Sequence, residues 1–256
     1  MTFNLRYDRP DPGVQNWQMR KEAIVELIHH YQPDLMGTQE LKPHQLSELK
    51  ALLPHYKTIG GDRRGDGTDE YCTIFYHPSR INCLETEDFY LSETPEIAGS
   101  ITPHWDNYAP RMVTWGLFKM DNPQRSLILL NTHFAHLSHK AREFSAELII
   151  RYCDRFPLEE SYLFLTGDFN AVPNSKERKI LKHPISDRIH FQDALESLTT
   201  KEQKTFHGFT GQATTAIDTI YYDRRVKLQD IAVERQQWRG VFPSDHFPII
   251  AYLILP

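Results

Sequence analysis

The alternation of short apolar strands with amphipathic helices constrains this sequence more than any other feature. Alternating apolar residues predict a strand over residues 2–6, and apolar residues at helical spacing after a capping position at Asn16 predict a helix. Pro33 ends that helix, a short buried strand is expected over residues 34–39, and Pro43 opens a second helix. The chain therefore begins with strand, helix, strand and helix.

The middle of the chain differs from this pattern, which then returns. Strand-like runs separated by turns rich in Gly, Pro and Asp indicate antiparallel pairing, and they cover residues 71–77, 81–91, 113–120 and 126–131. A helix capped by Ser138 follows. Further strands are expected over residues 162–166, 217–222 and 249–255.

No linker, internal repeat or low-complexity stretch divides the two halves of the sequence. We therefore expect one domain over residues 1–256, with an α/β (α+β) fold in which helices cover a largely antiparallel pair of sheets. Long surface loops are expected over residues 61–67 and 94–110, and loops of that length often shape a binding cleft.

Composition argues against several classes of protein. The 29 basic and 34 acidic residues give a net charge of −5, so nucleic-acid binding would need a local basic patch. Cys72, Cys83 and Cys153 are too few for a disulfide framework and lack zinc-site spacing. No apolar run approaches the about 20 residues that span a bilayer, and no signal-like segment opens the chain. We expect a cytoplasmic protein without membrane attachment, and we favour a monomer.

Chemically active side chains follow several of the apolar runs. Asp168 and Asn170 come directly after an apolar strand and, being two positions apart, face the same side of an extended chain. Such a pair can orient a water molecule and a phosphate oxygen. Asp245 and His246 lie between two prolines before the last strand, where carboxylate oxygen suits Mg²⁺ and histidine suits phosphate. Taken alone, each segment is also consistent with an ordinary turn or capped loop.

Polar side chains also follow or interrupt apolar strands at other positions. Glu40 follows the strand over residues 34–39, and His133 follows the strand over residues 126–131. Asp218 lies inside an apolar strand, where an ionised carboxylate is costly without a partner such as His246.

Taken in order, these segments resemble the endonuclease/exonuclease/phosphatase superfamily, which includes pancreatic-type deoxyribonuclease, abasic-site endonucleases, deadenylases, neutral sphingomyelinases and inositol-polyphosphate phosphatases. The ordered set is specific, although each motif is common alone. The motifs that carry the resemblance cover nearly the whole chain and read Thr-Phe-Asn4-Leu-Arg, Thr-Gln-Glu40, Pro-Arg111, Asn-Thr-His133, Gly-Asp168-Phe-Asn170, Ile-Asp218 and Ser-Asp245-His246-Phe-Pro. The resemblance implies a four-layer α/β sandwich, in which two packed mixed, largely antiparallel β-sheets are flanked by helices.

The resemblance also implies a metal site. Glu40 would be the principal Mg²⁺ ligand with Asn4 beside it, and Asp245 would support the metal region or a second ion. Mn²⁺ is the alternative cofactor. Asp168 would orient or deprotonate the attacking water, and Asn170 would hold phosphate.

The remaining motif residues would act on the substrate. Asp218 would pair with His246 and favour its charged form, which stabilises negative phosphate oxygens. His133 would face phosphate and act as general acid toward the leaving oxygen, with Glu70 as its carboxylate partner. Arg111 would bind phosphate through its guanidinium fork.

The implied activity is Mg²⁺-dependent hydrolysis of a phosphoester, either in a nucleic acid or in a small phosphorylated molecule. Basic residues cluster only at Arg63-Arg64 and Arg224-Arg225, interspersed with acids, so charge favours small substrates. A catalytically inactive phosphate- or metal-binding module is the alternative, because relatives often follow the Asn-Thr-His motif with leucine, an acid and histidine, whereas this chain reads Phe134-Ala135-His136. A lipid hydrolase is the third reading, and it would need an exposed apolar anchor that the sequence does not show.

Overall fold

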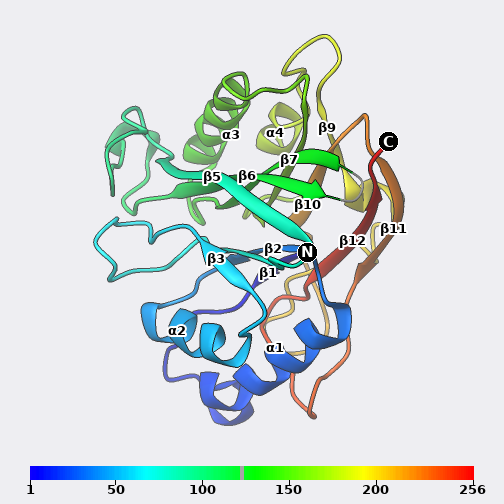
Figure 1. Ribbon diagram of the computed structural model, residues 1–256. Helices are drawn as coiled ribbons and strands as arrows, with labels where there is room; N and C mark the ends of the chain where they lie inside the picture. Colours follow the sequence, from blue (N-terminus) through cyan, green and yellow to red (C-terminus); the bar gives the residue numbers. More distant parts are fainter. Residues whose placement is uncertain (122–123) are drawn as a thin grey trace.

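The strands form two sheets that pack face to face, with helices on both outer faces (Figure 1). The computed structural model describes residues 1–121 and 124–256. Buried apolar side chains from both sheets, among them Ile74, Phe118 and Ile249, fill the space between the sheets. The expected four-layer α/β sandwich is confirmed.

The first sheet carries both ends of the chain. Its strands β1 (Thr2–Asn4) and β2 (Leu35–Gln39) are parallel, and the other neighbouring pairs are antiparallel. Its outer face packs against two helices through buried side chains such as Trp17 and Leu27. In spatial order the strands are β11 (Lys227–Val233), β12 (Ile249–Ile254), β1 (Thr2–Asn4), β2 (Leu35–Gln39), β4 (Ile74–Tyr76) and β3 (Lys57–Ile59), and the covering helices are α1 (Trp17–Tyr31) and α2 (Pro43–Leu52).

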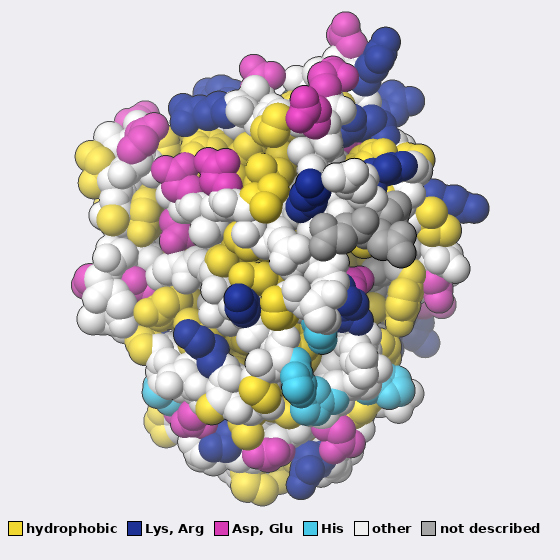
Figure 2. Space-filling model, viewed as in Figure 1, with side chains coloured by type: hydrophobic (Ala, Val, Ile, Leu, Met, Phe, Trp, Pro, Cys, Tyr) yellow, Lys and Arg dark blue, Asp and Glu magenta, His cyan; other side chains and the backbone are white. Residues whose placement is uncertain are grey.

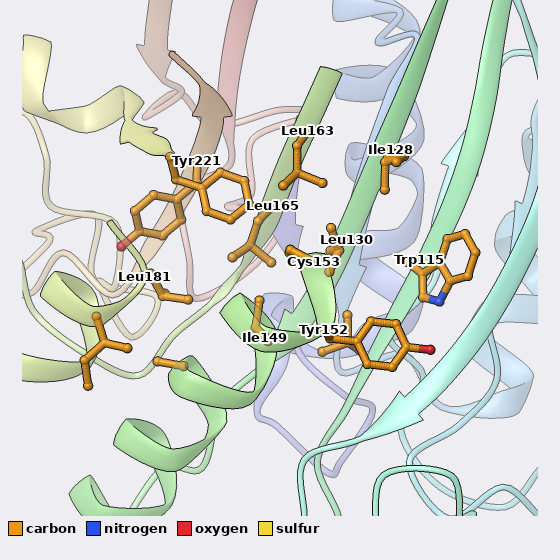
Figure 3. Close-up of a cluster of buried hydrophobic side chains, with 14 of the residues drawn as sticks. Trp115, Ile128, Leu130, Ile149, Tyr152, Cys153, Leu163, Leu165, Leu181 and Tyr221 are labelled. Atoms are coloured by element: carbon orange, nitrogen blue, oxygen red, sulfur yellow. The ribbon is translucent and has the colours of Figure 1, made fainter. Parts of the chain in front are cut away.

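The second sheet repeats this plan with the parallel pair β7 and β8 among antiparallel neighbours. Figure 3 shows Ile149 and Cys153 of the covering helix facing Leu130 and Leu165 of the sheet. In spatial order the strands are β5 (Ile81–Tyr90), β6 (Met112–Asp121), β7 (Gln124–His133), β8 (Ser161–Asp168), β10 (Asp218–Asp223) and β9 (Phe191–Asp193). The helices on this side are α3 (His139–Cys153) and α4 (Lys176–Ile180). Elsewhere in the described residues, short 3₁₀ turns occur at η1 (Gly13–Gln15), η2 (Pro103–Trp105) and η3 (Ala194–Ser197).

The helices begin where the sequence predicts. The Asn16 side chain accepts a hydrogen bond from the backbone N–H of Gln18 at the start of α1, and the Ser138 hydroxyl accepts one from Ala141 at the start of α3. Each cap satisfies a donor that the first helical turn leaves free. Pro43 is the first residue of α2, where its missing N–H costs nothing.

Other boundaries differ from the prediction. β1 ends at Asn4 rather than at residue 6, because Arg6 has a φ of 57°, which no strand residue adopts. β11 was not predicted, since it lies at a sheet edge and its register shifts between Leu228 and Asp230, which breaks the alternation. The strands β3 and β9 and the helix α4 are too short to leave a periodic signal. In the described part of the chain, no helix is both long and apolar enough to cross a membrane.

Candidate active site

The polar residues that follow the strands meet at one edge of the sandwich. Parallel pairing brings the carboxyl ends of β1 and β2 together, and it does the same for β7 and β8. His133 is the register partner of Asp168, and the antiparallel strand β10 places Asp218 opposite Asp168 on its other side. Residues far apart in the sequence therefore form one cluster because of strand order alone.

Asn4 connects the two sheets at this edge. Its Nδ2 donates to Glu40 Oε1 and to Asp168 Oδ2, both at 3.0 Å, while its Oδ1 accepts from the backbone N–H of Arg6 at 3.0 Å. These partners fix the orientation of the amide. In this arrangement Asn4 presents amide hydrogens to the two carboxylates and orients both of them.

Glu40 directly follows β2 and has a φ of 69°, an uncommon conformation that functional residues often adopt. Its Oε2 accepts from the backbone N–H of Tyr7 at 3.1 Å. Ligand atoms of Glu40, His133 and Asp168 all lie within 4.8 Å of one another.

Asp168 is almost completely buried, at 2% exposure. Its Oδ1 accepts from the backbone N–H of Asn170 at 2.9 Å, and its Oδ2 lies 3.9 Å from His246 Nε2. Burial, together with the nearby Asp218 charge, raises the pKa of Asp168 to about 7. A carboxyl group with such a pKa can gain and lose a proton near neutral pH.

The predicted pairing of Asp218 with His246 is present. His246 Nδ1 lies 2.8 Å from Asp218 Oδ2, which also accepts from the Thr205 hydroxyl at 2.6 Å. Burial by itself would lower the pKa of His246, but the Asp218 charge and hydrogen bond outweigh burial and raise that pKa to about 10. His246 is therefore a positively charged side chain at neutral pH.

His133 differs from His246 in charge. Its Nε2 lies 3.1 Å from Asn170 Nδ2, which can only donate, so Nε2 accepts and the ring proton resides on Nδ1. Burial, and next the charge of Arg111, hold the pKa of His133 well below its ordinary value. The imidazole is neutral.

Glu70 lies near His133 but does not pair with it. Its Oε2 accepts from Arg63 Nη1 at 2.9 Å, and the Lys42 ammonium lies 4.0 Å from its other oxygen. The predicted Glu70–His133 pair is therefore wrong: Arg63, which comes from a loop, is the nearer cation and satisfies the carboxylate.

Arg111 projects into the cleft beside Glu70 and His133. Among the described residues, its buried Nε has no hydrogen-bond partner. A buried guanidinium N–H without a partner is costly, so a bound anion would satisfy it.

Asp245 lies at the same edge, and its Oδ2 is 3.5 Å from Arg6 Nη1. Burial raises the pKa of Asp245, and the nearby Glu40 charge raises it further. Arg6 belongs to the Asn4 motif, but no sequence pattern connects its side chain with Asp245.

The cluster forms the floor of a cleft of about 990 Å³. Arg63 and Ala109 from the two predicted loops line the cleft, as expected. Sequence reasoning missed several further lining residues, because they are ordinary polar residues of loops and helix ends: Arg6, Tyr7, Asp11, Gln15, His136, His139, Arg142, Ser175 and Glu177.

The donors at this edge fit a divalent cation. Glu40 and Asp168 supply oxygen atoms and His133 supplies a nitrogen lone pair, all within reach of one position. Burial, and next the charges of acidic neighbours, raise the pKa of both Asp168 and Asp245, so negative charge is crowded at this edge. A cation bound beside them would relieve that repulsion.

The sequence model of the Endonuclease/Exonuclease/phosphatase family matches residues 1–246. The chain belongs to this family. Its members are phosphoesterases or nucleases, so membership supports a hydrolase. The resemblance inferred from the ordered motifs is confirmed, and the two six-stranded sheets are those of the family fold.

Solved structures of the family superpose over the full chain. An endonuclease/exonuclease/phosphatase from Bacteroides vulgatus is 31% identical with a TM-score of 0.90, and the match covers 100% of this chain and 97% of that one. A mannosyl-6-phosphatase from Bacteroides thetaiotaomicron is 28% identical with a TM-score of 0.85, covering 99% and 98%.

Curated relatives are more distant and longer. A probable CCR4-Not complex 3'-5'-exoribonuclease subunit from Encephalitozoon cuniculi is 22% identical, and the match covers 95% of this chain but 58% of that protein. The chain spans about three fifths of the length of the first curated relatives that it matches.

Proposed function

We propose that this family member is a Mg²⁺-dependent phosphoester hydrolase. The observation that carries the proposal is the contact of Asn4 with both Glu40 and Asp168. This contact places the proposed metal ligand Glu40 next to Asp168, the residue proposed to activate water. The charged His246 borders the same carboxylate of Asp168 at 3.9 Å. The cation-binding carboxylate of Glu40 and the anion-binding imidazole of His246 therefore both lie beside Asp168.

Glu40 would hold the cation, with Asn4, Asp245 and His133 beside it. Mg²⁺ favours oxygen ligands of this kind, and Mn²⁺ accepts them as well as a nitrogen ligand. When bound, the ion would supply Lewis-acid stabilisation of the charge that develops on phosphate oxygens.

The reaction then depends on how the side chains hold water and phosphate. Asp168, with a pKa of about 7, orients a water molecule and accepts its proton as the water oxygen attacks phosphorus. The bond from phosphorus to the leaving oxygen breaks in the same displacement. His246, kept charged by Asp218, stabilises the phosphate oxygens.

Arg111, Asn170 and His133 complete the proposed phosphate site. Among the residues that the structure describes, Arg111 Nε has no hydrogen-bond partner, which suits a contact of the guanidinium with phosphate. His133 is neutral and its Nε2 accepts, so it is not poised as a proton donor. We assign it to orienting the site and leave protonation of the leaving oxygen to water in the open cleft.

The substrate that fits best is a small phosphoester rather than a long nucleic acid. A polyanion is bound through a continuous basic surface, whereas this chain has a net charge of −5. On the face seen in Figure 2, basic and acidic side chains are interspersed. The similarity to a mannosyl-6-phosphatase agrees with a small phosphorylated sugar.

A substrate panel tests this function. Sugar phosphates, p-nitrophenyl phosphate, bis(p-nitrophenyl) phosphate, RNA and single- and double-stranded DNA are incubated with Mg²⁺, Mn²⁺ or EDTA. We expect metal-dependent release from a small phosphoester, lost in Asp168→Asn, which keeps the shape of the side chain. Faster turnover of nucleic acid would refute the substrate class. Failure of every substrate would favour the alternative, an inactive phosphate- or metal-binding module.

A further inference from the structure

His136 has no part in the function proposed above, yet its ring contacts a residue of the site. His136 Nδ1 lies 3.2 Å from Asn170 Oδ1. An amide oxygen only accepts hydrogen bonds, so His136 donates through Nδ1. The His136 side chain is exposed and lines the cleft.

A second contact of Asn170 shows which of its amide atoms is the oxygen and which is the nitrogen. Nδ2 donates to the backbone carbonyl of Phe134 at 3.1 Å, and a carbonyl cannot donate in return. The amide oxygen must then face His136. The same Nδ2 reaches His133 Nε2 at 3.1 Å, so the orientation of Asn170 also determines which nitrogen of His133 carries the proton.

A buried ion pair holds the segment that carries His136. Arg142 donates to the carbonyls of Ala135 and His136 at 2.9 and 3.0 Å, and to Glu177 Oε1 at 2.7 Å. Arg142 is 3% exposed and Glu177 is 2% exposed. Breaking such a pair is strongly destabilising, so α3 and α4 together fix the backbone at His136. The segment is anchored although Ala135 stands where relatives often have an acid.

We propose that His136 is a positioning residue that acts on the reaction through Asn170. By donating to the amide oxygen, His136 keeps the amide nitrogen of Asn170 directed at His133 and the Asn170 backbone beside Asp168. The kinetic test of this inference rests on the proposed hydrolase function. A second test, by NMR, does not depend on turnover.

A double-mutant cycle is the kinetic test, using the substrate that the panel identifies. His136→Ala is expected to lower kcat by roughly 10- to 100-fold with little change in KM, as loss of a supporting hydrogen bond typically does. In an Asn170→Ala background the same change is expected to have no further effect. His136→Gln, which keeps an N–H donor, is expected to restore part of the rate. His183→Ala, an exposed histidine outside the cleft, is the control.

Additive losses in the cycle would overturn the proposal, because His136 would then act independently of Asn170. The second test follows the Asn170 side-chain amide and the His133 ring nitrogens by ¹⁵N NMR. We expect both to shift in His136→Ala and to stay unchanged in His183→Ala. Unchanged signals in His136→Ala would also overturn the proposal. If the wild-type protein hydrolysed no substrate, the proposed function would be wrong. The NMR experiment would still test whether His136 positions Asn170.

Discussion

The imidazole of His246 keeps its proton because Asp218 lies beside it. Asp218 Oδ2 is 2.8 Å from His246 Nδ1, and the hydroxyl of Thr205 holds that oxygen in place. Burial by itself lowers the pKa of His246, and the charge and hydrogen bond of Asp218 raise it most, ahead of the charges of Asp168 and Asp245. Asp218 is thus the carboxylate that contributes most to keeping the His246 imidazole positively charged.

Asp218→Asn removes that charge while keeping the shape of the side chain. The pKa of His246 would then fall because the largest effect that raises it is lost, and we expect kcat at neutral pH to fall by about 10²- to 10³-fold as the imidazole loses charge. The basic limb of the kcat/KM profile reflects loss of the His246 proton, so it is expected near pH 10 in the wild type and at lower pH in the variant. The same basic limb in both proteins would show that His246 does not need Asp218.

At the scale of elements, helix ends hold the loops of the cleft. The Ser138 hydroxyl accepts from Ala141 at the start of α3 and donates to the backbone carbonyl of Trp105 at 2.7 Å. The cap therefore joins α3 to the loop that contains η2. Trp105 itself stacks on Phe144 of α3, with ring centroids 5.0 Å apart.

Ser138→Ala removes both hydrogen bonds. We expect it to lower the free energy of unfolding by roughly 1–2 kcal/mol, as loss of an N-cap typically does. Urea denaturation followed by circular dichroism measures the change, with the exposed Ser186→Ala as control. Equal stability of Ser138→Ala and the wild type would mean that water replaces the cap at no cost.

Comparing the observed strands and helices with those predicted shows which parts of the structure the sequence encodes locally. Order and type of the long strands and helices follow from periodicity and caps, and the ordered motifs predict the residues at the strand ends. The Glu70 partner could not be predicted, because Arg63 reaches Glu70 only through the fold of its loop. The role of Asn4 as a bridge depends on an amide orientation that Arg6 fixes, and no sequence pattern encodes it.

At the scale of the whole molecule, Asn131 of β7 joins the two sheets below the cleft. Its Nδ2 donates to the carbonyl of Thr38 at 2.9 Å, and its Oδ1 accepts from Gln39 Nε2 at 2.7 Å. A side chain at Gly37 would collide with Asn131, since a Cβ there would lie 2.4 Å from Oδ1. The sheets approach closely because Gly37 leaves room for this amide.

Asn131→Ala leaves buried backbone and side-chain groups unpaired between the sheets. We expect it to cost roughly 2–3 kcal/mol in the free energy of unfolding. The half-buried Ser126→Ala on the same strand is the control in urea denaturation. A loss no larger than in the control would indicate that the sheets are held by apolar packing alone.

A Mg²⁺ titration of hydrolysis tests the metal-dependent function most directly. The wild type is compared with Glu40→Gln, which removes a charge from the proposed cation site, and with Glu22→Gln on the exposed face of α1. We expect EDTA to abolish turnover, and Glu40→Gln to raise the half-saturating Mg²⁺ concentration by roughly 10- to 100-fold with Glu22→Gln unchanged. Identical titration curves for the wild type and Glu40→Gln, or turnover that persists in EDTA, would contradict a cation bound by Glu40.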